Sequence, residues 1–414
     1  MLSAFRNLHP LVINILIGTM FGRMATSMSI PFLAIYLTQV KNVSPGQTGL
    51  IIAVSSLVGI CTSFAGGYLS DRLGRKVVLF VSIFLWAGVF VLFGMAETVS
   101  GFFAANALNG FCKSIFEPAS RALLADLTEP KNRLAIFNLR YTAINVGVIF
   151  GPLLGFYFGS SESTSAFFIA AGVYVLYGIS LIVTYKKTGY SGANLKGTAN
   201  QKPVRFADAA RIAINDRILL LALIGNILAV LAYAQFNSTL PQFLSGSLGG
   251  DKGAALFSGL LILNAVTVIT IQYPLLAFIK RYPPILSIMA GNLISSISVL
   301  LFAFADSVPL WGAVIFLFTI GEVLMFSMTD AFLDSIAKPD LRGTYFGAMG
   351  FTQIGNIAGP SLGGFLLSWF GFSDPLPVFG ILAGISLLGV PVMFAVKVHM
   401  KRELLHGGAS KTAI

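Results

Sequence analysis

The sequence predicts an all-α integral membrane protein with twelve transmembrane helices in two pseudo-symmetric six-helix bundles. Hydrophobic residues make up 56% of the 414 residues and charged residues only 10%, whereas soluble domains carry roughly 25% charged residues. Apolar runs long enough to cross a bilayer, which takes about 20 residues, occur twelve times. A glycine–proline motif in the first half of the chain also recurs in the second half.

The apolar runs follow one another along the chain with short polar connections. They lie near residues 11–38, 46–69, 77–96, 100–125, 133–158, 165–185, 217–244, 253–279, 285–305, 308–332, 343–370 and 376–396. Several exceed the length that a span needs, which predicts tilt or extension past the bilayer. No positively charged leader with a small-residue cleavage site precedes the first run.

The distribution of Lys and Arg predicts the orientation in the membrane. With a cytoplasmic N-terminus, 21 of the 27 Lys and Arg residues fall in cytoplasmic segments and four lie inside spans. Only Lys41 and Lys252 fall on the outside. Because cytoplasmic loops are enriched in Lys and Arg, we expect both termini to be cytoplasmic in a multi-pass protein of the cell membrane.

The longest polar stretch, residues 186–216, separates six spans from six. Its Gly-, Ser- and Asn-rich first part is typical of a flexible linker, and 206–214 is typical of a short amphipathic helix on the membrane surface. We therefore expect four segments: an N-terminal bundle over 1–185, a cytoplasmic linker over 186–216, a C-terminal bundle over 217–396 and a cytoplasmic tail over 397–414.

The repeated motif lies in predicted spans 5 and 11. The first copy consists of Gly147, Gly151, Pro152 and Gly155, and the second of Gly355, Gly359, Pro360 and Gly363. Each residue of one copy is 208 positions from its equivalent. A period of half the chain indicates two parallel six-helix repeats around a central binding site, an arrangement found in transporters.

Composition excludes several classes of function. The formal charge of +11 does not indicate nucleic-acid binding, because the apolar bulk is incompatible with a soluble binder. The two cysteines lie in apolar runs and the three histidines near the ends, so no disulfide framework, metal site or cofactor is expected. No phosphate-binding loop, nucleophile elbow or filter-like segment is present, which argues against an enzyme, an ATP-driven pump or a channel.

The loop between predicted spans 2 and 3 carries a distinctive motif, Gly66-Gly67-Tyr68-Leu69-Ser70-Asp71-Arg72-Leu73-Gly74-Arg75-Lys76. Gly67 and Gly74 permit close helix approach and a tight turn. The carboxylate of Asp71 is expected to accept hydrogen bonds at the start of span 11, where a helix N-terminus favours negative charge. Arg72, Arg75 and Lys76 are expected to bridge to Asp126 at the end of span 4.

This loop resembles the signature loop of the major facilitator superfamily, and the motif in span 5 resembles that of its drug/proton antiporter branch. The resemblance implies the major facilitator fold, with helices 1, 4, 7 and 10 lining a central cavity. It also implies that the loop contacts latch the two halves in an outward-facing state. The second copy of the loop, near Lys280, has no acid, so a single latch is expected. Alternatively, the basic residues only follow the orientation rule.

Charged residues inside spans are the main functional candidates, because each costs about 2.5–3.5 kcal/mol to insert. They are Arg23 in span 1, Lys113, Glu117 and Arg121 in span 4, Arg140 in span 5 and Glu322 in span 10. The three in span 4 share one helix face. We expect proton coupling at Glu117 and Glu322, which would face each other across the pathway in the family's fold. Alternatively, Glu117 forms a permanent salt bridge with Lys113 or Arg121, and Arg23 either pairs with Glu117 or binds an anion.

One position departs from the antiporter branch. The family's span-4 motif has an Arg four residues before a Gly, whereas Asn106 stands four residues before Gly110 here. The resemblance therefore supplies no proton-linked Arg at this place, and Arg23 or Arg121 would have to replace it.

The leading hypothesis is a proton-coupled, multidrug-type efflux transporter, an antiporter for lipophilic or cationic small molecules driven by the proton gradient. The expected cavity is rich in aromatic residues and contains Phe21, Tyr36, Phe111, Tyr141, Asn145, Tyr233, Asn237, Phe318, Phe326 and Gln353. The alternative is a proton-coupled symporter for peptides or another small nutrient. The expected partners are protons, a small-molecule substrate and the lipid bilayer, with the protein as a monomer.

Overall fold

The computed structural model describes residues 8–35, 37, 41, 43, 45–158, 164–190 and 206–405. Helices dominate, and no strand occurs among these residues. Tyr36, one of the expected cavity residues, lies outside them. The chain forms two compact units: one comprises Met1–Arg211 and Ala337–Gly350, and the other comprises Ile212–Ile336 and Phe351–Ile414.

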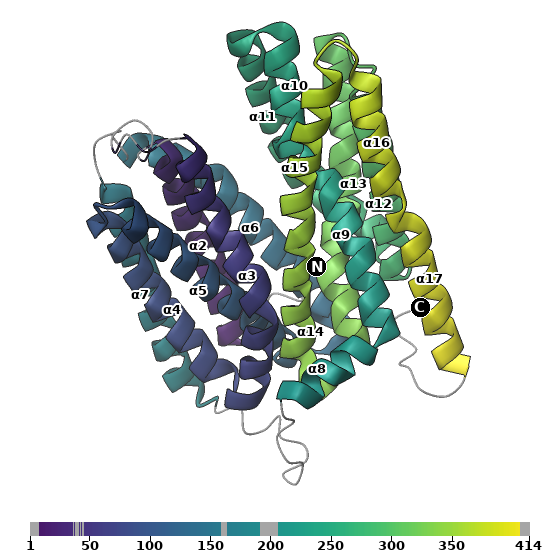
Figure 1. The fold of residues 1–414 in the computed structure, drawn as a ribbon. Coiled ribbons are helices and arrows are strands. Elements are labelled where there is room, and N and C mark those ends of the chain that lie inside the picture. The colour runs from purple at the N-terminus through teal and green to yellow at the C-terminus, as the bar shows by residue number, and fades with distance from the viewer. Residues whose placement is uncertain are drawn as a thin grey trace. The chain divides into compact units, whose positions relative to one another are not determined.

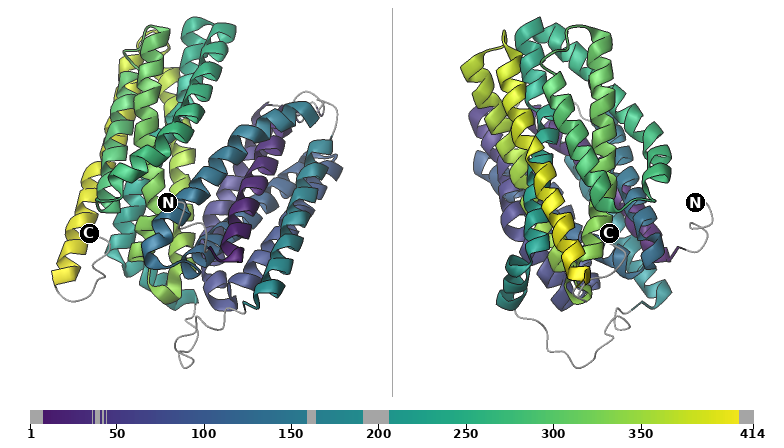
Figure 2. Two further views of the ribbon diagram at one scale, coloured as in Figure 1. Left: turned by 180° about the vertical axis from the view of Figure 1, so that it is seen from behind. Right: turned by 90° about the vertical axis from the view of Figure 1, so that its right-hand side faces the viewer.

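The first unit contains six long helices that lie side by side in Figures 1 and 2. They are α2 (Pro10–Ile35), α3 (Pro45–Leu73), α4 (Arg75–Met95), α5 (Val99–Asp126), α6 (Pro130–Phe158) and α7 (Ser165–Thr188). Helix α5 packs against α3 and α4, and α2 packs against α6 and α7. The segment Ala337–Gly350 joins this unit from the second half of the sequence through η3 (Pro339–Leu341) and α14 (Arg342–Ala348).

The second unit contains the remaining long helices. They are α9 (Arg217–Asn237), α10 (Thr239–Leu248), α11 (Gly250–Ile279), α12 (Pro284–Leu301), α13 (Val308–Ile336), α15 (Gln353–Phe370), α16 (Pro375–Leu387) and α17 (Gly389–Leu405). A short 3-10 turn, η4 (Met349–Thr352), precedes α15. The aromatic rings of Phe302, Phe318 and Phe379 form part of the buried core of the second unit. Between membrane helices such packing stabilises mainly through van der Waals contact.

The helices agree with the predicted runs, with three interruptions. Runs 7, 11 and 12 are each divided: α9 ends before α10 at Ser238, α14 and α15 are separated by η4, and α16 ends before α17 at Leu388. Among the described residues, ten segments are long and apolar enough to cross a membrane. Predicted spans 4 and 11 are not among them, because α5 carries several charged and amide side chains and span 11 is broken and glycine-rich.

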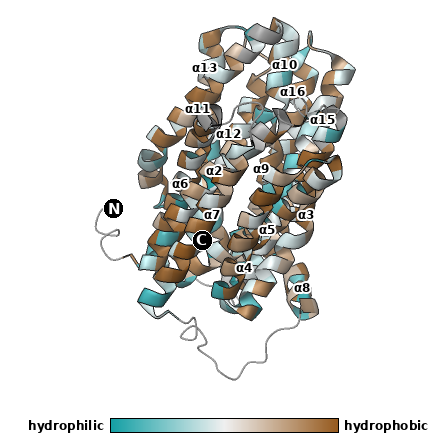
Figure 3. Cartoon of the chain, turned by 90° about the vertical axis from the view of Figure 1, so that its left-hand side faces the viewer, coloured by the Kyte–Doolittle hydropathy of each residue, from teal (hydrophilic) through white to brown (hydrophobic). Residues whose placement is uncertain are grey.

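Hydrophobic residues, drawn in brown, predominate along the long helices in Figure 3. The predicted amphipathic segment forms a helix, α8 (Phe206–Asn215). The ring of Phe206 contacts those of Phe64 and Tyr68 on α3, with centroids 5.8 and 5.2 Å apart. Asp208 on the same helix is exposed, as expected for a helix with one polar face.

The repeated glycine motif serves the same packing role in each unit. A Cβ atom on Gly147 of α6 would lie 2.5 Å from the carbonyl oxygen of Met20 and 2.7 Å from Cβ of Arg23, both on α2. The equivalent Cβ on Gly355 of α15 would lie 2.5 Å from the carbonyl oxygen of Ile227 on α9. Only glycine permits these approaches, so the motif fixes α6 on α2 and α15 on α9.

Candidate functional site

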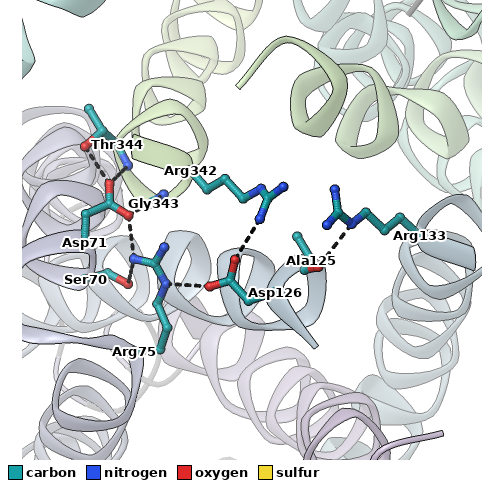
Figure 4. Close-up of polar contacts among 9 residues, drawn as sticks. All are labelled: Ser70, Asp71, Arg75, Ala125, Asp126, Arg133, Arg342, Gly343 and Thr344. Atoms are coloured by element: carbon teal, nitrogen blue, oxygen red, sulfur yellow. Dashed lines mark hydrogen bonds and ion pairs between the residues drawn. The ribbon is translucent and has the colours of Figure 1, made fainter. Parts of the chain in front are cut away.

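The loop motif lies where α3 and α4 meet the segment Ala337–Gly350 (Figure 4). The Asp71 carboxylate accepts hydrogen bonds from the backbone N–H of Gly343 at 2.9 Å and of Thr344 at 2.6 Å. It also accepts one from the Thr344 hydroxyl at 2.7 Å. Three donors from one short segment hold Asp71 in a single orientation, as predicted for the start of span 11.

Arg75 links this carboxylate to a second one. Its Nη1 donates to Asp71 Oδ1 at 2.5 Å and its Nε donates to Asp126 Oδ2 at 3.1 Å. The other Asp126 oxygen accepts from Nη1 of Arg342 at 3.0 Å. Two arginines and two aspartates therefore form one network with no net charge, and all four side chains are at most 15% exposed. We call these four residues the latch network.

The backbone around the latch network requires glycine at two positions. A Cβ on Gly67 would collide with the carbonyl group of Gly343, so α3 and α14 approach backbone to backbone. Gly74 has φ of 91° and precedes the first residue of α4, a conformation that other residues rarely adopt. The turn there aims Arg75 toward both carboxylates.

Two of the three predicted bridges to Asp126 are wrong. Arg72 directs Nη1 toward the Tyr68 hydroxyl at 3.4 Å. The Lys76 ammonium lies over the ring of Tyr185 on α7, 5.5 Å from its centroid. Successive residues of a helix point about 100° apart, so Lys76 faces α7 when Arg75 faces the latch network.

A second group of charges surrounds Glu117 inside the first unit. Oε2 of Glu117 accepts a hydrogen bond from Nη2 of Arg140 and lies 3.8 Å from Nη2 of Arg121. Oε1 lies 3.4 Å from Nη2 of Arg23. Lys113, one turn earlier on α5, interacts electrostatically with Glu117. We call these five residues the Glu117 cluster; with every member ionised it carries a charge of +3.

The sequence did not indicate that Arg140 pairs with Glu117. The Arg140 side chain is 2% exposed, against 28% for Arg23 and 23% for Arg121. A usable signal was present, because Arg140 stands seven residues before Gly147 and so on the same face of α6. Since Gly147 packs against α2 at Arg23, this face of α6 lies beside the helix that carries Arg23, which also contacts Glu117.

Glu322 in α13 has a different environment. Glu322 is buried, with 4% of its surface exposed. Its Oε2 accepts a hydrogen bond from the Asn264 amide of α11 at 2.8 Å. The same amide donates to the Thr319 hydroxyl at 2.9 Å. The described hydrogen bond of Glu322 thus comes from an uncharged amide, whereas Glu117 contacts guanidinium groups. Asn264 was not predicted; its signal is an amide within an apolar run.

The expected cavity residues do not share one environment. Phe318 is fully buried and stacks on Tyr233 at 6.2 Å between centroids, so its assignment to a cavity lining is wrong. Tyr233 also contacts Phe326 edge to face at 5.0 Å. Within helices, the Asn145 amide donates to the carbonyl of Tyr141 and the Asn356 amide to Gln353. Phe21 and Asn237 are exposed, and Phe111 is partly buried.

The remaining predicted residues have different outcomes. Glu117 and Glu322 belong to different units, so their facing each other stays a prediction. Gly151 packs on α2 as Gly147 does, whereas the side-chain environments of Pro152 and Gly155 lie outside the described residues. Asn106, which replaces the family's Arg, donates to the backbone carbonyl of Ile51 on α3 at 2.5 Å, so it is a helix-packing residue here.

Comparisons with known proteins agree with this architecture. The sequence model of the Major Facilitator Superfamily matches residues 15–353. An uncharacterized MFS-type transporter of Bacillus subtilis, YqjV, is 48% identical over 402 residues, 97% of each chain. A Na(+), Li(+), K(+)/H(+) antiporter of Planococcus maritimus is 25% identical over 396 residues, 90% of this chain and 92% of that one.

Two further matches extend the comparison. Multidrug resistance protein 1 of Bacillus subtilis is 26% identical over 329 residues, covering 78% of this chain and 82% of that one. A crystal structure of the human organic anion transporter TETRAN superposes with a TM-score of 0.66 over 93% of this chain and 99% of that chain. At 16% identity, this second match shows the fold alone.

Proposed function

Because the chain belongs to the major facilitator superfamily, and is therefore a multi-pass membrane transporter rather than an enzyme, we propose that it exchanges protons for lipophilic or cationic small molecules and exports them by alternating access. Members of the family bind small-molecule substrates. The proton gradient supplies the driving force in this proposal, without a cofactor.

The observation that carries the proposal is the environment of Glu322. A carboxyl group deep in a span is costly when ionised and is often part of a proton pathway. The uncharged amide of Asn264, which also donates to Thr319, can stabilise it in either protonation state, because the carboxyl accepts a hydrogen bond when ionised and keeps acceptor capacity when protonated. Movement of α11 or arrival of a cation would then change its proton affinity.

Glu117 has a different part in this scheme. Three guanidinium groups surround its carboxylate. We assign it the role of a counter-ion that links Arg23, Arg121 and Arg140, and we assign proton transfer chiefly to Glu322.

Relatives support the direction of transport and the proton coupling. One is a cation/H(+) antiporter and another a multidrug resistance protein. The first supports a second candidate function, exchange of monovalent cations for protons. A symporter of peptides or another nutrient remains the alternative, with no relative among those compared above in its favour.

The latch network supports alternating access. We propose that it stabilises the outward-facing state by holding α14 against α3 and α5, and that its loss accompanies opening toward the cytoplasm. The proposal includes the orientation predicted from Lys and Arg, with the latch network and both termini on the cytoplasmic side, and a monomer as the working unit.

The test uses purified protein in liposomes with an imposed pH gradient. Lipophilic cations, neutral lipophilic compounds, Na(+) or K(+), and dipeptides are compared with and without a protonophore. We expect protons to move in the direction opposite to the drug-like compounds. Transport of these compounds should stop when the protonophore dissipates the pH gradient. Exchange with monovalent cations alone would favour the second candidate, and proton movement together with dipeptides would refute export.

A further inference from the structure

Two lysines flank the seam between α4 and α7 at the end of the first unit that carries the latch network. The two helices pack side by side (Figure 1). Lys76 belongs to the first turn of α4 and Lys186 to the last turn of α7, and both are exposed. Neither helix contains an Asp or Glu, and no described ion pair involves either lysine. The seam therefore ends in positive charge that no side chain of the two helices balances.

Contacts with aromatic rings orient Lys76. Its Nζ lies 5.5 Å from the centroid of the Tyr185 ring and 6.0 Å from that of the Phe80 ring. Because Tyr185 belongs to α7 and directly precedes Lys186, the side chain of Lys76 reaches across the seam. The face of a ring attracts an ammonium group, whose N–H groups can still donate to another acceptor. The rings thus position this ammonium without neutralising its charge.

Away from the lysines, the seam continues as an apolar surface. On α7, Val175, Ile179 and Lys186 follow one another at spacings of four and seven residues, which places them on one helix face, and the two apolar side chains are exposed. On α4, the exposed ring of Phe84 packs on Gly178 of α7. Exposed apolar side chains on membrane helices face lipid acyl chains, which are equally apolar. The surface is charged at one end and apolar along its length, as a phospholipid is.

From this arrangement we propose that the seam between α4 and α7 binds an anionic phospholipid, with its phosphate between Lys76 and Lys186 and its acyl chains along the apolar side chains. Long basic side chains near helix ends extend to the level of the headgroups. Basic pockets between membrane helices bind anionic headgroups. The inference goes beyond the proposed function, because it requires neither a transported substrate nor proton coupling.

The chemistry of the seam favours an anionic lipid over two other occupants. A zwitterionic headgroup carries a cation of its own, which the two lysines repel. Free phosphate or glycerol phosphate would satisfy the lysines, but it has no acyl chain to cover the apolar side chains. Only a lipid with net negative charge matches both parts of the surface.

The test is a titration of the purified full chain in detergent, followed by native mass spectrometry. The probes are dioleoyl phosphatidylglycerol, dioleoyl phosphatidylcholine, which has the same acyl chains, and glycerol phosphate, which has none. Each lysine near a headgroup contributes on the order of fivefold in affinity. We therefore expect the anionic lipid to bind about tenfold or more tightly than the zwitterionic one, and glycerol phosphate to bind far more weakly than the anionic lipid.

The variants separate this site from general electrostatics. Lys76→Gln and Lys186→Gln are each expected to reduce the preference for the anionic lipid about fivefold. Lys76→Arg and Lys186→Arg should retain it, because a guanidinium group also binds phosphate. The matched control is Lys187→Gln: this lysine is also exposed, but it points about 100° away from Lys186, so the preference should stay unchanged. Thermal unfolding of each variant verifies that it is folded.

Four results would overturn the inference. The first is equal binding of the two lipids by the unaltered chain, and the second is a preference that survives Lys76→Gln and Lys186→Gln combined. The third is a loss in Lys187→Gln as large as in Lys186→Gln, which would indicate general electrostatics. The fourth is binding of glycerol phosphate as tight as that of the anionic lipid, which would indicate a site for free phosphate. Because no transport is measured, failure of the proposed function would leave this test unaffected.

Discussion

Two carboxyl groups of the same type have different chemistry here because their neighbours differ. Glu117 is surrounded by guanidinium groups, and Glu322 accepts from the amide of Asn264. Sequence reasoning found both acids from the cost of charge inside a span. It did not pair them with Arg140 and Asn264, because these two residues lie on other helices and their facing depends on helix rotation.

The contact between Glu117 and Arg140 gives a prediction at the scale of single residues. Breaking a buried ion pair costs about 3–5 kcal/mol, because the remaining charge has lost its partner. Glu117→Gln and Arg140→Gln should therefore each lower the midpoint of thermal unfolding in detergent. The double variant should lose much less than the sum of the two.

The matched comparison for this prediction is Arg121→Gln. Arg121 lies 3.8 Å from the same carboxylate and is more exposed, so its loss should be the mildest of the three single changes. Additive losses in the double variant would indicate that the Glu117–Arg140 contact contributes nothing specific.

At the scale of elements, glycines decide which helices meet. The sequence predicted that the two glycine–proline motifs are equivalent, and both bring a later helix onto an earlier one, α6 on α2 and α15 on α9. It also predicted Asp71 at the start of span 11. It did not predict the breaks at Ser238 and Leu388 or the split of span 11 into α14 and α15, because apolar composition continues through them.

The crossing of α3 and α14 gives a prediction at this scale. A methyl group on Gly67 would collide with the carbonyl of Gly343, so Gly67→Ala should separate the two helices and weaken the hydrogen bonds to Asp71. We expect slower transport with the substrate affinity little changed. Gly88→Ala in α4 is the control, since a Cβ there meets no atom within 4 Å.

If the Gly67→Ala variant transports its substrate at the same rate as the Gly88→Ala variant, α3 and α14 tolerate a wider spacing. The latch network would then not depend on this approach of the two backbones.

For the whole molecule, the latch network is one of the described contacts that join α14, from the second half of the sequence, to the helices of the first half. Replacing Asp71 by Asn removes the charge while keeping the shape. This weakens the bond to Arg75 and leaves Arg75 and Arg342 with one carboxylate between them. Charge-assisted hydrogen bonds contribute about 1.5–3 kcal/mol each, enough to shift a two-state equilibrium roughly tenfold or more.

We therefore expect Asp71→Asn to populate inward-facing states. Single cysteines placed on the cytoplasmic and external sides of the pathway, in a chain without Cys61 and Cys112, should react faster with a membrane-impermeant thiol reagent on the cytoplasmic side and more slowly outside. Unchanged accessibility on both sides would contradict the role of the latch network.

The family resemblance supplied the general architecture, whereas the proposed proton coupling depends on a single side chain. The most direct test compares Glu322→Gln with wild type in liposomes, using Glu97→Gln, a change at an exposed acid, as control. Two quantities are measured for one transported compound: uptake driven by a pH gradient, and counterflow without one. We predict that Glu322→Gln abolishes the first and retains the second, while Glu97→Gln retains both. Gradient-driven transport that persists in Glu322→Gln would show that another group carries the proton.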